Sequence, residues 1–240
     1  MNLTNQKPQP QPKALKPESF QIKLPNVLIM GESGAGKTRS ICGLNPADTK
    51  ILLTEKSTLT FPNARRFYEA GSVFCETTFV GIMQTIIELS KDTNTKFIVI
   101  DSFTGMWRSA LKMAQKDYSG FAVWDNFAKY VQDFLNLIMD IPQCVMVISH
   151  SEKVTTNDSD SDYTIEVVIE GKKIKKLPMA SSFECCIYAS KEFSSDDSVQ
   201  YCFYTNALRH TPAKSPEGML DRVIPNDLGL VAKSIVEYYK

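Results

Sequence analysis

The sequence lacks an excess of charge of either sign and lacks a long apolar run. Its 240 residues include 27 Lys and Arg against 27 Asp and Glu, so the formal net charge is zero. This balance excludes a protein that coats nucleic acid by bulk positive charge, but it leaves room for a local basic surface. No stretch approaches the roughly 18–20 apolar residues of a membrane helix, and the first residues lack the apolar core of a signal peptide. We therefore expect a cytoplasmic protein with no membrane contact.

Cysteine and histidine do not form a zinc-binding pattern. The six cysteines, at positions 42, 75, 144, 185, 186 and 202, include no C-x-x-C pair, and the two histidines, His150 and His210, lie far from any cysteine pair. Structural zinc is therefore not expected. Three of the cysteines stand in apolar runs, which indicates reduced thiols in the core and agrees with a cytoplasmic location.

The length and the 43% hydrophobic content fit one large globular domain. Residues 1–19 hold four prolines and three glutamines but few large apolar residues, so their ordering would not be offset by burial. We expect a flexible Pro/Gln-rich tail over residues 1–23 and a single domain over residues 24–240.

Short apolar runs alternate with longer amphipathic stretches. They predict strands at 26–30, 50–55, 97–101 and 143–149, and helices at 80–90 and 121–140. The strand segments are continuously apolar, so each strand is expected to be covered on both faces. Strands that alternate with helices predict right-handed βαβ units and an α/β fold with a mostly parallel sheet.

The pattern changes after residue 150. Residues 154–162 form a polar, acidic loop, and 163–178 are predicted to form a hairpin that turns at Glu170-Gly171. Two more strands, at 185–190 and 199–205, extend the sheet in antiparallel fashion. A helix capped by Asp227 or Asn226 closes the chain.

The sharpest motif is GESGAGKT at residues 31–38, which matches G-x-x-x-x-G-K-[ST] between a predicted strand and a helix-compatible segment. Glycines let successive N–H groups point at phosphate oxygens, and the helix N-terminus adds its dipole. Lys37 would neutralise the β- and γ-phosphates, and Thr38 would offer its hydroxyl to Mg²⁺. The alternative is a Gly-rich turn that binds nothing. The predicted nucleotide-binding residues are Gly31, Glu32, Ser33, Gly34, Ala35, Gly36, Lys37, Thr38 and Arg39.

Three polar residues at predicted strand ends are the remaining site candidates. Asp101 ends the apolar run FIVID and is placed to hold Mg²⁺, unless it only caps the next turn. Ser102 follows it where many phosphate-loop ATPases have Glu, so the catalytic base must come from elsewhere. Glu55 at the end of LLTE is the candidate base, and the alternative is that it is only a solvated carboxylate at a strand end. His150 is a candidate γ-phosphate sensor, and the alternative is that it only makes a hydrogen bond that caps the following loop.

These motifs carry a family resemblance. GESGAGKT, LLTEK, FIVIDS and VMVISH occur in the order of RecA-like ATPase cores, and IDS with a glutamate one strand earlier is closer to RecA-type recombinases than to AAA+ remodellers. With VIEGKKIKKLP and AKSPEGMLDRVIPNDLGLV, residues 24–240 resemble small phage-encoded single-domain RecA-like P-loop ATPases, the Sak-type recombination proteins and phage ATP-binding proteins.

The resemblance implies a RecA-like P-loop NTPase fold and Mg²⁺-dependent ATP hydrolysis by Lys37, Glu55 and His150. It also implies single-stranded DNA as the partner in phage recombination or replication, directly or with a single-strand-binding protein. Assembly into a homo-oligomeric ring or filament is expected, in which a neighbour's cation completes the site. Arg209 and Lys214 are the candidates, unless they are merely solvated.

Two segments are candidates for DNA contact. The loop after residue 153 carries Asp158, Asp160 and Asp162, which would repel phosphate. A lysine cluster is the better electrostatic candidate, although a charged edge strand that discourages aggregation explains it equally. Residues 107–124 mix cations with aromatic residues. This mixture is typical of a stacking platform for single strands, but a helix pair with an ordinary core face explains it equally. The cluster consists of Lys172, Lys173, Lys175 and Lys176.

A DNA-linked ATPase is the leading interpretation. A small-molecule or nucleotide kinase is a second class, although no Arg-rich lid segment and no acceptor pocket are apparent in the sequence. A nucleotide-gated interaction protein with little hydrolysis is the third, and DNA-stimulated phosphate release separates the three.

Overall fold

The computed structural model describes residues 23–155, 163–170, 179–193, 198–207 and 210–240. Residues 1–22 of the predicted tail lie outside this set. Lys23 belongs to the folded part, because its Nζ donates to the carbonyls of Ile138 and Met139 at 2.6 Å each. These carbonyls lie at the end of α4 (Phe121–Asp140), so the domain begins by capping this helix.

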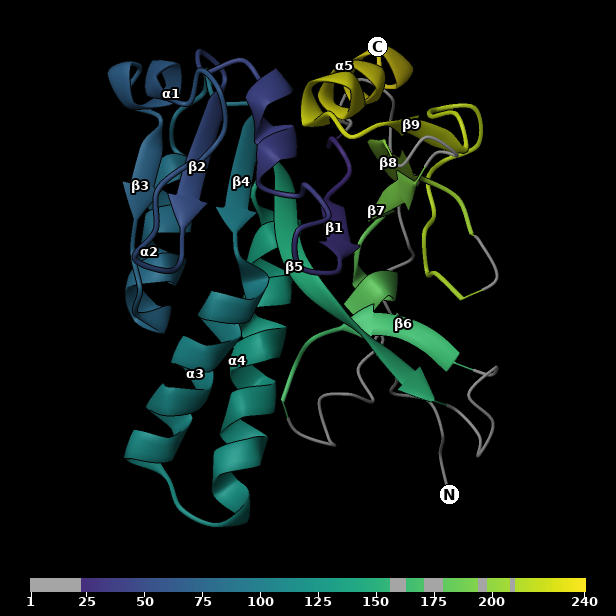
Figure 1. Cartoon of the computed structure of the whole chain (residues 1–240). Helices are drawn as coiled ribbons and strands as arrows, with labels where there is room; N and C mark the ends of the chain where they lie inside the picture. The colour runs from purple at the N-terminus through teal and green to yellow at the C-terminus, as the bar shows by residue number, and fades with distance from the viewer. Residues whose placement is uncertain (1–22, 156–162, 171–178, 194–197, 208–209) are drawn as a thin grey trace, which may run out of the picture.

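A mixed sheet runs through the whole domain in the order β3-β2-β4-β5-β1-β7-β8-β9 (Figure 1). The strands from β3 to β7 are parallel, and β8 and β9 are added antiparallel to β7. This confirms the predicted α/β fold with a parallel core and an antiparallel C-terminal extension. The strands are β1 (Val27–Gly31), β2 (Thr49–Leu53), β3 (Val73–Cys75), β4 (Phe97–Asp101), β5 (Cys144–Thr155), β6 (Tyr163–Val167), β7 (Cys185–Phe193), β8 (Val199–Tyr204) and β9 (Val223–Pro225).

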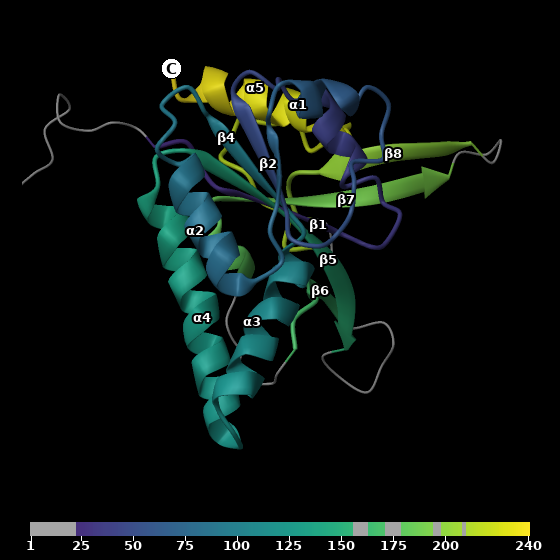
Figure 2. The same ribbon diagram turned by 90° about the vertical axis from the view of Figure 1, so that its left-hand side faces the viewer.

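Helices cover both faces of the sheet. Figure 2 shows α2, α3 and α4 together on one face, and α1 and α5 on the other. Side-chain caps start three of them: Thr78, Ser102 and Asp227 each accept a backbone N–H from the first turn. Besides α4, the helices are α1 (Arg65–Glu69), α2 (Phe79–Leu89), α3 (Phe103–Asp117) and α5 (Leu228–Tyr238), with short 3-10 turns η2 (Arg39–Gly43) and η3 (Met179–Ser182).

The central strands are apolar at every position because they separate two cores. Along β1, Leu28 and Met30 pack with α2, α3 and α4. Val27 and Ile29 point to the opposite face and pack with α5. Since successive strand residues alternate between faces, a strand buried on both sides needs apolar residues throughout. The three-layer arrangement predicted from the continuous runs is therefore confirmed.

Several strands end elsewhere than predicted, and one of them is β7, which was predicted to end at residue 190 and runs on to Phe193. β2 stops at Leu53, and β5 runs on to Thr155 as a two-stranded arm with β6. In this arm Ser151 pairs with Val167 and Thr155 with Tyr163, so the first half of the hairpin predicted at Glu170-Gly171 forms a strand that pairs with β5. Half-covered arm residues mix polar with apolar types, which hides the strand from a search for apolar runs. Residues 171–178 lie outside the described part, and no described helix is long and apolar enough to cross a bilayer.

Candidate nucleotide-binding site

The loop that follows β1 has the backbone of a phosphate-binding loop. Gly34 and Gly36 adopt positive φ angles of 74° and 82°, which L-residues rarely take. A Cβ on Gly31 would lie 2.5 Å from the carbonyl oxygen of Ala189 in β7. All three glycines of the motif are therefore required, two by backbone conformation and one by a close approach. The segment after the loop is the short 3-10 turn η2, where the sequence had indicated only a helix-compatible stretch.

Lys37 is folded back onto its own loop. Its Nζ donates to the carbonyls of Gly31 and Glu32 at 2.8 Å each, and the residue is 6% exposed. Burial lowers the pKa of Lys37 to about 8, against the opposing effect of Asp101 and Glu32. The ammonium group therefore remains mostly charged at pH 7, held by carbonyls at the place where phosphate oxygens would replace them.

Asp101 and Thr38 meet at the end of β4. The Thr38 hydroxyl donates to Asp101 Oδ2 at 2.8 Å. Burial raises the pKa of Asp101, while the Thr38 hydrogen bond and the charge of Lys37 act against this shift. A hydroxyl beside a carboxylate fits Mg²⁺, which binds few protein oxygens and takes its other ligands from water and phosphate. Among the described residues no cluster of three or more His, Cys, Asp or Glu stands ready to hold a metal, so phosphates would have to supply ligands.

His150 lies in the same cavity as Lys37 and Asp101, a hollow of about 770 Å³. The sequence predicted that His150 ends its strand. Instead, β5 continues past it, and His150 lies opposite Gly31 in the β1–β5 ladder. Burial and then the charge of Lys37 lower the pKa of His150, so its imidazole is neutral at pH 7. Its carbonyl accepts from Val168 N at 2.9 Å. The residue thus lines the cavity, and its backbone is tied to the chain that follows β6.

Glu55 lies in the turn two residues beyond the end of β2. Its side chain is half exposed and forms an ion pair with Arg108 of α3, with 3.6 Å between Oε1 and Nη1. A Cβ on Gly105 would lie 2.5 Å from Glu55 Cγ, so the carboxylate rests against the first turn of α3. The charge of Glu55 acts to raise the pKa of Asp101 and opposes the lowering of the pKa of His150, although Glu55 is not among the residues that line the cavity. Its role as base remains a prediction.

Sequence reasoning missed the contribution of β8 and the segment before α5. Val199 and Tyr201 form one wall of the phosphate cavity. A Cβ on Gly36 would lie 3.1 Å from Tyr201 Cδ1, and Asn226 Nδ2 donates to the Ala35 carbonyl at 3.0 Å. Asp227, one of the two predicted caps, starts α5 by accepting from Gly229 N at 2.7 Å. Asn226 instead holds the phosphate loop.

A second cation also reaches the loop from the same chain. Lys191 Nζ lies 3.4 Å from the point that a Cβ on Gly34 would occupy, and its charge helps to lower the pKa of Lys37. Lys191 pairs directly with Tyr201 in the β7–β8 ladder. Period-two alternation along both strands was the available signal, since it puts Lys191 and Tyr201 on one face with Ala189.

The other sequence candidates that the structure describes are not brought to the phosphate loop. Lys214 pairs its backbone with Cys186, at 2.8 and 2.9 Å, near the start of β7. Arg209 and the lysines at 172, 173, 175 and 176 lie outside the described residues. Trp107 is 3% exposed and packs on Phe103, so the alternative of a helix pair with a core face holds there. Of the predicted platform's aromatic residues, Tyr118 and Phe121, around the α3–α4 turn, are exposed, as are its cations.

A phosphate loop after a central parallel strand, β1, with a carboxylate at the end of a second parallel strand, β4, one strand away across β5, defines the class of P-loop nucleotide-binding ATPases. Residues 23–216 match the model of the AAA domain family, and because this match spans most of the chain, the protein belongs to that family. It is thus a nucleotide-binding P-loop protein of an ATPase family, and a divalent metal goes with that activity. A search of curated proteins finds no match.

Proposed function

We propose that the protein hydrolyses Mg²⁺-bound ATP and couples hydrolysis to single-stranded DNA, in phage recombination or replication in the host cytoplasm. The hydrogen bond between Thr38 and Asp101 is the observation that carries the ATPase part. It joins the two motifs, 63 residues apart in sequence, at one sheet edge. The RecA-like sequence pattern supports the DNA part.

Binding of the triphosphate requires few movements. The Nζ of Lys37 exchanges the Gly31 and Glu32 carbonyls for β- and γ-phosphate oxygens, and the N–H groups of the loop donate to the same phosphates. Thr38 and Asp101 would hold Mg²⁺, which neutralises charge as the terminal phosphate departs. The neutral imidazole of His150 lines the same cavity and would report whether that phosphate is present.

Water activation is assigned to Glu55. Its carboxylate is engaged by Arg108 in this structure, so it must turn from α3 toward the cavity before it orients water. The ion pair joins two half-exposed side chains, and exposed pairs of this kind contribute at most about 1 kcal/mol. Such a pair is weak enough to open when nucleotide or a neighbouring subunit binds.

Assembly into a ring or filament would supply the trans-acting cation, with Arg209 and Lys214 as the candidates from sequence. Lys191 supplies a cation in the same chain. Dependence of the turnover number on protein concentration separates the two sources, since a site completed in trans loses activity on dilution.

The test is phosphate release with Mg²⁺ and ATP, with and without single-stranded DNA, across protein concentration and salt. The proposal expects DNA to raise the rate and salt to reduce that gain. A rate that needs a small acceptor and ignores DNA would indicate the kinase alternative. ATP-dependent assembly that survives Glu55→Gln with little hydrolysis would indicate the nucleotide-gated interaction protein.

A further inference from the structure

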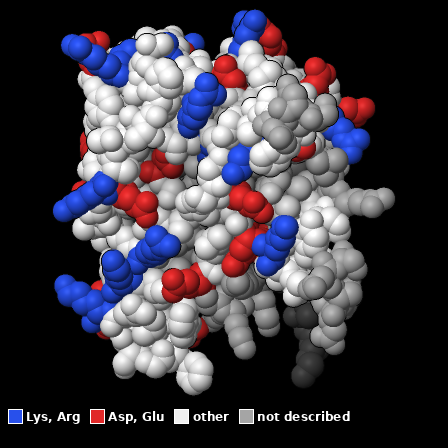
Figure 3. Space-filling view, viewed as in Figure 1, with Lys and Arg blue, Asp and Glu red and all other residues white. Residues whose placement is uncertain are grey.

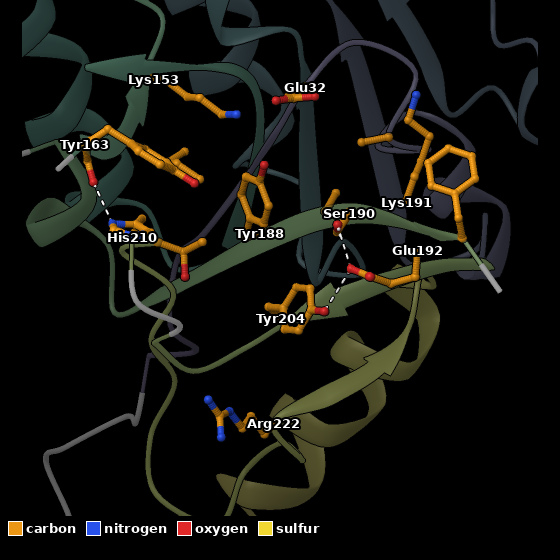
Figure 4. A pocket seen from close by; sticks show the side chains of 15 residues that line it. Glu32, Lys153, Tyr163, Tyr188, Ser190, Lys191, Glu192, Tyr204, His210 and Arg222 are labelled. Atoms are coloured by element: carbon orange, nitrogen blue, oxygen red, sulfur yellow. Dashed lines mark hydrogen bonds between the residues drawn. The ribbon is translucent and has the colours of Figure 1, made fainter. Parts of the chain in front are cut away.

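A second cavity, of about 730 Å³, lies on the other side of the phosphate loop. Figure 4 shows it between the β5–β6 arm, which carries Lys153 and Tyr163, and the β7–β8 hairpin, which carries Tyr188 and Tyr204. We call this space the arm groove. Its volume falls within the roughly 300–1,000 Å³ typical of sites for organic ligands, so it accommodates at least one nucleotide unit.

Aromatic rings line the arm groove from both sides. Tyr163 stacks on His210 with 4.2 Å between ring centroids and 24° between ring planes. The stack is fixed by a contact of 2.8 Å between His210 Nδ1 and the Tyr163 carbonyl. Tyr188 and Tyr204 face this pair from β7 and β8 (Figure 4). Rigid aromatic faces at the wall of an open groove are the feature that binds nucleobases irrespective of sequence.

Cations stand apart from one another around these rings. Lys153 lies over Tyr163, with Nζ 5.2 Å from the ring centroid, while Lys191 and Arg222 lie at other margins in Figure 4. Two carboxylates, of Glu32 and Glu192, oppose them. Glu192 already accepts from Ser190 and Tyr204, at 3.0 and 2.8 Å. Charges are mixed in the same way over the face shown in Figure 3, where basic and acidic side chains are interspersed. Separate cations suit a strand with spaced phosphates better than the clustered phosphates of a free nucleotide.

The arm groove shares its wall with the ATP site. Glu32 and Ala35 line the arm groove, whereas Gly34, Gly36 and Lys37 line the phosphate cavity. The Glu32 carbonyl also accepts from Lys37 Nζ. A ligand that contacts Glu32 and a triphosphate that draws Lys37 away therefore act on one loop. Each would change the affinity for the other by the same factor.

We propose that the arm groove binds single-stranded nucleic acid, with bases on Tyr163, Tyr188 and Tyr204 and phosphates on Lys153 and Arg222. Lys153 would leave the face of the Tyr163 ring for a phosphate, and a base would take its place there. This inference rests on the proposed coupling to DNA and assigns the DNA-binding site to the arm groove. It replaces the sequence-predicted platform at residues 107–124, whose Trp107 is buried.

The test measures binding of a fluorescein-labelled oligothymidylate to the full chain by anisotropy, in variants that still show thermal stabilisation by Mg²⁺ and ATP. Tyr163→Leu removes the ring and keeps an apolar side chain, and we expect roughly tenfold weaker binding or more. Tyr163→Phe keeps the ring and should bind as the wild type does. Lys153→Gln should lower the slope of log affinity against log salt by about 0.7.

Phe121→Ala is the matched control, because Phe121 is 90% exposed at the start of α4 and belongs to the competing platform. Unchanged affinity in Tyr163→Leu and Lys153→Gln, with loss in Phe121→Ala, would overturn the arm groove and leave the DNA function standing. No oligothymidylate binding by the wild type at low salt would overturn both. Displacement of the oligomer by thymidine monophosphate at equal nucleotide concentration would show a free-nucleotide site instead of a strand site.

Discussion

Replacing Gly36 by Ala tests how the phosphate loop is held by the C-terminal strands. Gly36 has φ of 82°, and an added Cβ would lie 3.1 Å from Tyr201 Cδ1 and 3.3 Å from Asn226 Nδ2. Left-handed backbone costs an L-residue about 1–2 kcal/mol. The tight contacts add about 1 kcal/mol, at the low end for overpacking, since both neighbours are side chains.

We therefore expect Gly36→Ala to lower the free energy of unfolding by about 2–3 kcal/mol. For a domain of this size, the melting temperature then falls by roughly 4–12 °C. Affinity for ATP should fall as well, because the loop N–H groups move. Denaturant unfolding and calorimetric titration with ATP measure the two effects.

Gly71→Ala is the matched control. Gly71 also has a positive φ, of 62°, but nothing lies within 4 Å of an added Cβ. It should show only the backbone cost of about 1–2 kcal/mol and unchanged ATP affinity. In a double-mutant cycle, Tyr201→Ala should recover part of the Gly36→Ala loss. Equal costs at Gly36 and Gly71, or no coupling to Tyr201, would refute the packing of β8 against the loop.

The remaining predictions concern Glu55, Lys37 and Asp101. Glu55→Gln should retain ATP binding and reduce turnover at least about a hundredfold in a phosphate-release assay; near-normal turnover would assign the base elsewhere. The pKa of Lys37 is about 8, so kcat/KM should fall as pH rises through 8. The same lowered pKa reduces the free energy of unfolding below pH 8, and this loss should disappear as the pH rises from 8 to 10.5. Lys37→Met is the reference, because its free energy of unfolding should show no such change. Asp101→Asn should abolish Mg²⁺-dependent turnover yet raise the melting temperature at pH 7, because burial raises the pKa of Asp101. That gain should vanish below pH 3.8, where the carboxyl is protonated in both the folded and the unfolded states; a variant less stable at pH 7 would contradict the direction of the shift.

The centre of the domain could be predicted because its strands and phosphate loop are determined by residues close together in the sequence. β1 and β4 are buried on both faces and therefore show as unbroken apolar runs, and the glycines of the phosphate loop are dictated by backbone conformation. The meeting of Thr38 with Asp101 followed from the rule that parallel strands end at one edge.

The parts that sequence reasoning missed depend on pairing between distant segments. The second half of β5 is paired with β6 and has no apolar run to mark it. Tyr201 and Lys191 reach the loop only because β7 adds to β1 in parallel and β8 folds back along it. Nothing in the residues around Asn226 indicates that its side chain ties α5 to Ala35, 191 positions earlier in the chain.

The central claim is hydrolysis at the phosphate loop, and the most direct measurement compares the phosphate-release rates of the wild type and Lys37→Ala with Mg²⁺ and with a chelator. Lys37 carries the one buried cation among the described residues that line the cavity. We predict turnover by the wild type that the chelator abolishes, and no turnover by Lys37→Ala. Full activity of Lys37→Ala would contradict the account.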